Sequence, residues 1–158
     1  MRRVTAVLSV AAVVLWAAAA FAQGKDFSGK WAPDAEKNAA AAGAGGGGGG
    51  GGRGGGRGGG GPMTITQDAK TLTIEREGPN GATKTVYNLD GSESKNQQMG
   101  RGGATEVVST AKWDGNKLVI TTKGANGDTV ASWYLEGGEL VNERTGQNGV
   151  MKTYYKKG

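Results

Sequence analysis

The chain has 158 residues, a formal net charge of +5 at neutral pH, 32 glycines, and neither histidine nor cysteine. Without these two residue types there can be no disulfide, no catalytic histidine base and no zinc site with sulfur or imidazole ligands. Four of the positive charges, Arg2, Arg3, Arg53 and Arg57, lie at the N-terminus or in a glycine tract, so the rest of the chain is nearly neutral. This balance disfavours a nucleic-acid partner, which usually requires a basic face.

Residues 1–22 have the features of a secretory signal peptide. A basic start precedes an apolar stretch rich in Ala, Val and Leu, which ends in the sequence AFA at residues 20–22. We expect cleavage before Gln23 and a periplasmic or secreted mature protein. The alternative is an uncleaved membrane anchor, since a spanning helix needs roughly 20 residues. The cleavage sequence favours the signal peptide, so we expect no stable membrane anchor after processing.

The first predicted strand covers residues 26–32 (DFSGKWA), with Phe27 and Trp31 as its apolar anchors. Pro33 should end this strand, because proline cannot donate a hydrogen bond to a neighbouring strand. Asp34 is a candidate N-cap for a short helix over residues 35–42, which Gly43 would end.

Residues 39–61 are predicted to be a disordered insertion rich in Ala, Gly and Arg. From residue 45 onward this segment has almost no side chains to bury and a large backbone entropy to lose. Arg53, Arg57 and Arg101 begin Arg-Gly-Gly repeats similar to those of RNA-binding proteins. No aromatic residues are interleaved with them, so a flexible spacer is the better interpretation.

Beyond residue 62, turn-forming residues recur at steps of about 10 to 12 positions, which is typical of antiparallel hairpins. They are Ala69, Gly81, Gly91, Gly103, Gly115, Gly127, Gly138 and Gly149. With the early strand, these turns predict an all-β, antiparallel up-and-down meander of about ten strands in a single domain, residues 23–158. Closure into a barrel would remove the exposed edges, and a barrel of this size leaves room for a ligand.

Apolar and polar residues alternate in the segments between these turns, as in half-buried strands. If Leu72 and Leu140 face the interior, the same alternation turns Arg76 and Arg144 inward, where they are candidates for binding an anionic group. The alternative is that each guanidinium group extends into solvent near its strand end.

The sequence FSGKW at residues 27–31 resembles the Gly-x-Trp opening of the calycins, the family of lipocalin and fatty-acid-binding-protein barrels. Other segments resemble the turns and closing strand of the ten-stranded fatty-acid-binding proteins: TITQD at 64–68, LTI at 72–74, GELV at 138–141 and NGVMKTYYK at 148–156. FSGKW together with KWDGNKLVI at 112–120 is similar to secreted bacterial proteins that carry FSGxW and KWDGxxLVI. The resemblance implies a calycin-like barrel that binds a small ligand without a cofactor.

Two departures from the family limit what the resemblance implies. The family has a two-helix lid between its first two strands, whereas this chain has the alanine-rich stretch and the glycine tract there, so the lid should be missing. The family positions that hold a ligand carboxylate correspond to Thr153, Tyr155 and Trp133, so fatty-acid specificity is not carried over.

Aromatic and aliphatic residues supply the other candidate site. Trp31 should plug the base of the barrel beneath a cation such as Lys152 or Lys156. For Trp113 and Trp133, filling the core is the alternative to lining a ligand cavity. The ligand-lining candidates are Ile74, Trp113, Ile120, Trp133, Leu135 and Tyr154.

The sequence therefore predicts a monomeric, non-enzymatic binding protein for a small apolar or amphipathic ligand, with no cofactor and no metal. The alternative is a protein-interaction module, such as an inhibitor or envelope accessory protein, with a solid barrel. A third hypothesis, a glycan hydrolase that uses Glu75 and Glu77, requires a carboxylate pair that alternation places on the solvent face. We therefore expect no enzymatic turnover.

Overall fold

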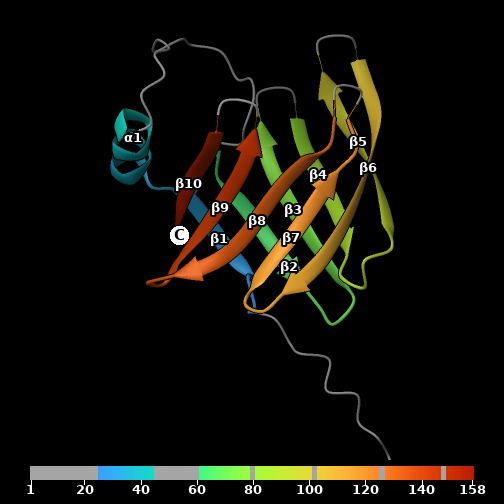
Figure 1. Ribbon diagram of the computed structural model, residues 1–158, viewed down its shortest axis with the longest axis horizontal. Coiled ribbons are helices and arrows are strands. Elements are labelled where there is room, and N and C mark those ends of the chain that lie inside the picture. Colours follow the sequence, from blue (N-terminus) through green and yellow to red (C-terminus); the bar gives the residue numbers. More distant parts are fainter. Residues whose placement is uncertain (1–24, 45–60, 79–80, 101–102, 125–126, 147–148) are drawn as a thin grey trace, which may run out of the picture.

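The fold is an all-β barrel, as the sequence predicts. The computed structural model describes residues 25–44, 61–78, 81–100, 103–124, 127–146 and 149–158. In these ranges ten antiparallel strands form one sheet that wraps into a nearly closed barrel (Figure 1). The strands are β1 Gly29–Pro33, β2 Met63–Gln67, β3 Thr71–Gly78, β4 Gly81–Asn88, β5 Glu93–Gly100, β6 Gly103–Asp114, β7 Lys117–Thr122, β8 Thr129–Glu136, β9 Glu139–Gly146 and β10 Gly149–Lys157.

Consecutive strands pair as neighbours except β4 and β5, and the first strand also pairs with the last. The order in the sheet is β4-β3-β2-β1-β10-β9-β8-β7-β6-β5. Trp31 of β1 lies opposite Lys157 of β10, so the beginning and the end of the described barrel meet in its wall. Each glycine predicted to form a turn has a positive φ, for example 60° at Gly115 and 87° at Gly138. Such angles suit glycine, which has no Cβ.

One end of the barrel is filled by an apolar core. Phe27 and Leu118 are fully buried there, and the Trp31 side chain is 2% exposed. The indole Nε1 of Trp31 donates a 2.8 Å hydrogen bond to the carbonyl of Phe27, which fixes the plug at the base. The cation over the Trp31 ring is Lys157, at 5.7 Å, because Lys157 is the β10 residue opposite Trp31. The prediction of Lys152 or Lys156 in this position is therefore wrong.

The other end of the barrel is open. The first four residues of β4, β6 and β10 are exposed on both faces. Thr83 and Met151 occupy inward register positions in this part, and Met151 is 64% exposed. The barrel is therefore a cup with a packed base and a solvent-filled mouth.

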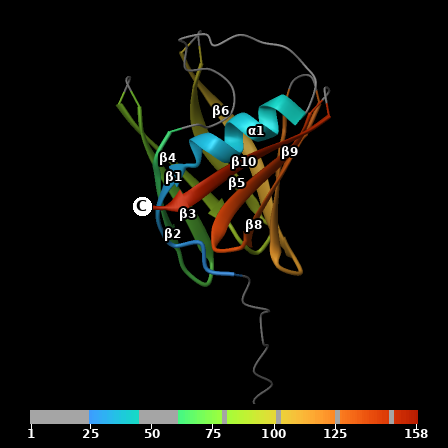
Figure 2. The ribbon, with the colours of Figure 1, turned by 90° about the vertical axis from the view of Figure 1, so that its left-hand side faces the viewer.

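The helix α1 (Ala35–Ala44) lies against the outside of β10 (Figure 2). Asp34 caps it, since its carboxylate accepts a hydrogen bond from the Lys37 amide. The helix continues past Gly43, so residues 39–44 are helical and do not belong to a disordered insertion. The predicted signal peptide and residues 45–60 lie outside the described residues. Within the described ranges, no helix is long and apolar enough to cross a membrane.

Asn38 of α1 completes the hydrogen bonding of β10 where β1 ends. The side-chain amide of Asn38 donates to the Tyr154 carbonyl at 3.0 Å and accepts from the Tyr154 amide at 2.7 Å. The Asp34 amide also donates to the Tyr154 carbonyl. A single asparagine side chain thus takes the place of a neighbouring strand.

An asparagine side chain also bridges the gap, or seam, between β4 and β5, the two strands at the ends of the sheet order. Asn96 accepts a hydrogen bond from the Val86 amide at 2.8 Å and donates to the Val86 carbonyl at 2.9 Å. The Asn88 amide donates to the Ser94 hydroxyl, and the Asn88 side chain donates to the Glu93 carbonyl. Side chains rather than a backbone ladder therefore join the barrel at this seam.

We predict that Asn96→Ala lowers the free energy of unfolding by about 1–3 kcal/mol, because both polar groups of Val86 lose their partner. Urea denaturation followed by circular dichroism measures the effect. Gln97→Ala is the control, since Gln97 lies on the exposed face of the same strand. Equal midpoints for the two variants would show that Asn96 does not hold the seam.

Candidate functional site

The inner wall of the barrel becomes polar above the apolar core. Arg76 follows the buried Leu72 and Ile74 on β3, and Arg144 follows the buried Leu140 on β9, all at the spacing of two that keeps side chains on one face. The register therefore places both arginines at inward positions. Their role in binding an anion stays a prediction.

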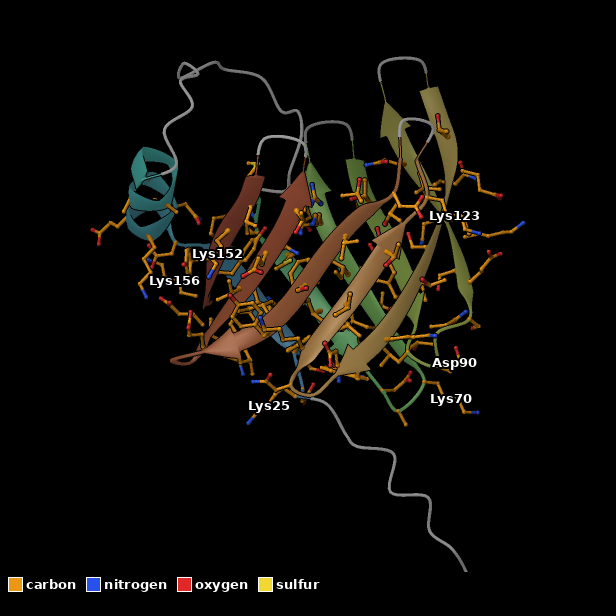
Figure 3. All side chains as sticks on the ribbon, viewed as in Figure 1. Lys25, Lys70, Asp90, Lys123, Lys152 and Lys156 are labelled. Atoms are coloured by element: carbon orange, nitrogen blue, oxygen red, sulfur yellow. The ribbon has the colours of Figure 1, made fainter. Side chains whose placement is uncertain are left out.

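Carboxylates are missing from the inner face of the described strands. By the same register, every acidic residue of these strands holds an outward position: Glu75, Glu77, Glu93, Glu106, Asp114, Glu136, Glu139 and Glu143. Labelled lysines such as Lys70 and Lys156 lie at the periphery of the molecule (Figure 3). Among the described residues, the open half of the interior thus holds arginines with no compensating acid.

Arg76 has a buried donor without a partner. Its Nη1 atom is inaccessible to solvent and makes no hydrogen bond. The guanidinium carbon lies 5.9 Å from the ring centroid of Tyr155, which supplies a cation–π contact but no acceptor. Burying a charged donor without an acceptor is unfavourable, so this atom marks a position that an acceptor group from a ligand would stabilise.

Asn142 provides a second buried donor of this kind. Its side chain is 7% exposed, and Nδ2 has no hydrogen-bond partner. In the register, Asn142 lies between Trp133 of β8 and Thr153 of β10. Trp133 stacks on Tyr155 at 6.2 Å, so Asn142 and Arg76 both border the same aromatic pair.

Tyr87 of β4 faces the interior opposite Leu72. Burial raises the pKa of the Tyr87 hydroxyl, while the positive charges of Arg144 and Arg76 act in the opposite direction. The phenol is therefore neutral at physiological pH and keeps its proton for hydrogen bonding. By the register, Tyr87, Arg76 and Arg144 all face the interior of the barrel.

A cavity of about 810 Å³ reaches Arg76 through the side of the barrel. It arises because β1 and β2 have five residues each whereas β3 has eight, so the last residues of β3 pair with β4 but have no strand on the β2 side. Trp31, Met63 and Arg76 contribute from the inner face. The rim residues include Lys30, Pro62, Glu75, Glu77, Lys84 and Gly158.

The predicted ligand-lining residues lie elsewhere. Ile74, Ile120 and Trp133 are buried in the apolar core, and Trp113 and Leu135 pack against it. None of them lines the 810 Å³ cavity, and Arg76 alone among the predicted site residues does so. For Trp113 and Trp133 the structure thus agrees with the alternative of core filling. Contact of these residues with a ligand stays a prediction.

Tyr154 does not face the interior, contrary to the prediction. Its neighbour Tyr155 is buried in the core, so alternation turns Tyr154 outward, opposite Val141. There Lys37 of α1 lies 5.8 Å from the Tyr154 ring centroid. The sequence contains two consecutive tyrosines, and only the pairing with β9 and β1 decides which one faces inward.

Two further polar networks lie on the outer face. Tyr134 donates a hydrogen bond to Glu143, which also pairs with Lys152. Hydrogen bonds with Tyr134 and Glu143 raise the pKa of Lys152. Glu75 pairs with Lys84 at 3.2 Å with both side chains more than half exposed, which fits a solvated face. Within the described ranges, no group of three His, Cys, Asp or Glu side chains could hold a metal ion.

The fold is similar to that of solved calycin-like barrels. A variant of the fluorescent protein UnaG superposes with a TM-score of 0.51 at 25% identity, covering 61% of this chain and 70% of that chain. A variant of the fatty acid transporter REP1-NXSQ superposes with a TM-score of 0.51 at 20% identity, covering 61% of this chain and 71% of that chain. No known protein family and no curated protein matches the sequence.

We predict that Arg76→Met raises the stability of the ligand-free protein by about 1–3 kcal/mol, because it removes the buried donor without a partner and keeps an apolar stem. Chemical denaturation without added ligand measures this change. Arg144→Met is the control, since Arg144 is exposed and should change stability by no more than about 0.5 kcal/mol. Lower stability in Arg76→Met would mean that the guanidinium group is satisfied within the protein.

Proposed function

We propose that this protein is a non-enzymatic binding protein for a small amphipathic ligand, with the ligand's anionic group held at Arg76 inside the barrel. The observation that carries this proposal is Arg76, which lines a cavity of about 810 Å³ and whose buried Nη1 atom has no acceptor. Buried charged donors are nearly always hydrogen-bonded in proteins, and a ligand group is one partner that would satisfy this donor.

The surroundings of Arg76 suit a ligand with both polar and apolar parts. Trp31 and Met63 present apolar surface to the cavity beside the guanidinium group. Small-molecule sites combine mostly apolar walls with a few placed polar groups, as this one does. The fold is also that of REP1-NXSQ, which is described as a fatty acid transporter, so a barrel of this kind is compatible with carrying an amphipathic anion.

A solid barrel that acts as a protein-interaction module is the second candidate. The packed apolar half favours it, because most of the large inward side chains are already buried against one another. The open mouth and the two unpaired donors favour a ligand instead. The binding experiment below decides between these two functions.

We predict that the wild-type protein binds the fluorescent amphipathic anion 1-anilinonaphthalene-8-sulfonate and that Arg76→Gln weakens binding about tenfold or more. The physical reason is the loss of a charge-assisted hydrogen bond. Fluorescence titration of folded protein measures both affinities.

Lys95→Gln is the matched control, because it removes the same charge from the outer face of β5, where Lys95 pairs with Glu106. It should leave the affinity unchanged. Equal losses in both variants would indicate a nonspecific charge effect, and an absence of binding in wild type would favour the interaction module.

We also propose that the protein acts in the periplasm or outside the cell after cleavage before Gln23. The support is the basic, apolar and small-residue pattern of residues 1–22. Expression of the full chain in a bacterial host, followed by fractionation and N-terminal sequencing, should give a periplasmic or secreted product that begins at Gln23. Retention of residues 1–22 in a membrane fraction would contradict this proposal and favour the anchor.

A further inference from the structure

We infer that the ligand is a compact organic anion with several acceptor oxygens, rather than a long-chain amphipath. This inference rests on the proposed function and specifies the ligand class for the same site. Three features of the interior support it. The base is filled by apolar side chains, several hydrogen-bond donors face inward above the base, and the inward charged groups are positive.

The base of the barrel, where an alkyl chain would lie in the interior, is filled by the protein's own side chains. Leu118 and Leu140 are fully buried, and Ile120 and Ile74 are no more than 5% exposed. They belong to one continuous core that includes Phe27 and the tryptophan plug at the base. A chain of many methylene groups would have to displace these contacts, which cost free energy to break.

The space above this core is surrounded by donors. Arg76 and Asn142 each have a buried N–H group without a partner, and their strands, β3 and β9, lie on opposite sides of β10 in the sheet order. By the register, Tyr87 and Arg144 also face the interior. A ligand with one acceptor group could satisfy one of these donors, whereas a ligand with several acceptor oxygens could satisfy two or more.

The charge of this space selects against other ligands. By the register, no carboxylate of the described strands faces inward, and Glu75 and Glu77 lie only on the outer rim of the side cavity, so a cation inside the wall has no counter-charge. A neutral ligand would leave the arginines without a counter-charge. A compact anion gains from both the net charge and the hydrogen bonds.

Isothermal titration calorimetry of the full barrel with four probes tests the inference: isophthalate, benzoate, benzamide and palmitate. We expect isophthalate to bind about tenfold more tightly than benzoate, because its second carboxylate reaches a second donor. We expect benzamide to bind more weakly than benzoate. Palmitate should show no binding that depends on Arg76.

Asn142→Val identifies the second donor. It should lower the affinity for isophthalate about tenfold and leave the affinity for benzoate unchanged, since valine keeps the buried volume but has no donor. Asn116→Val is the matched control, because Asn116 is exposed in the β6–β7 turn. Circular dichroism of both variants establishes that they are folded.

The outcomes separate this inference from the proposed function. Palmitate binding that is tighter than isophthalate binding and is lost in Arg76→Gln would overturn the inference and support the proposed function. Equal affinities of benzoate and isophthalate, or an unchanged isophthalate affinity in Asn142→Val, would also overturn the inference. If none of the probes, including 1-anilinonaphthalene-8-sulfonate, binds through Arg76, both are overturned.

Discussion

Each buried peptide group in a barrel wall needs a hydrogen-bond partner, and this requirement decides how the sheet closes. The backbone ladder runs without interruption from β4 round to β5 but does not join these two strands to each other. Asn96 supplies the missing partner at that seam, and Asn38 does the same for β10 beyond the end of β1. In both places an amide side chain forms the pair of bonds that a neighbouring strand would form.

The short first two strands have consequences for the interior as well. Because β2 begins at Met63, the side chain of Arg76 borders a side cavity instead of a continuous wall. The pairing of the other strands places the apolar residues at the base and the arginines, Asn142 and Tyr87 above them. The candidate site is thus a polar layer between a packed base and an open mouth. Its donors are held in place by strands, which favours a preorganised site.

Much of this architecture is predictable from the sequence because its signals are local. Turn glycines and the alternation of apolar and polar residues can be recognised in short stretches of sequence. They therefore predict where the strands lie and that Arg76 and Arg144 point inward. The prediction that Tyr154 faces inward is wrong. Two adjacent tyrosines do not show by themselves which one points into the barrel, and only the pairing with β9 decides it. Asn142 was missed, although it lies two residues before Arg144 on the same face. The roles of Asn38 and Asn96 depend on strands far along the chain, and no local pattern encodes them.

The asparagine-braced seam also bears on how such a barrel can diversify. A backbone ladder fixes the distance between two strands, and changing it requires an insertion or a shift that reverses every side chain. A joint made by Asn96 and Asn88 can be widened, narrowed or rebuilt by single substitutions, because the strands on either side keep their own pairing. The diameter of the barrel can therefore change step by step, in evolution or by redesign. The pairing of the strands that carry Arg76 and Arg144 is retained.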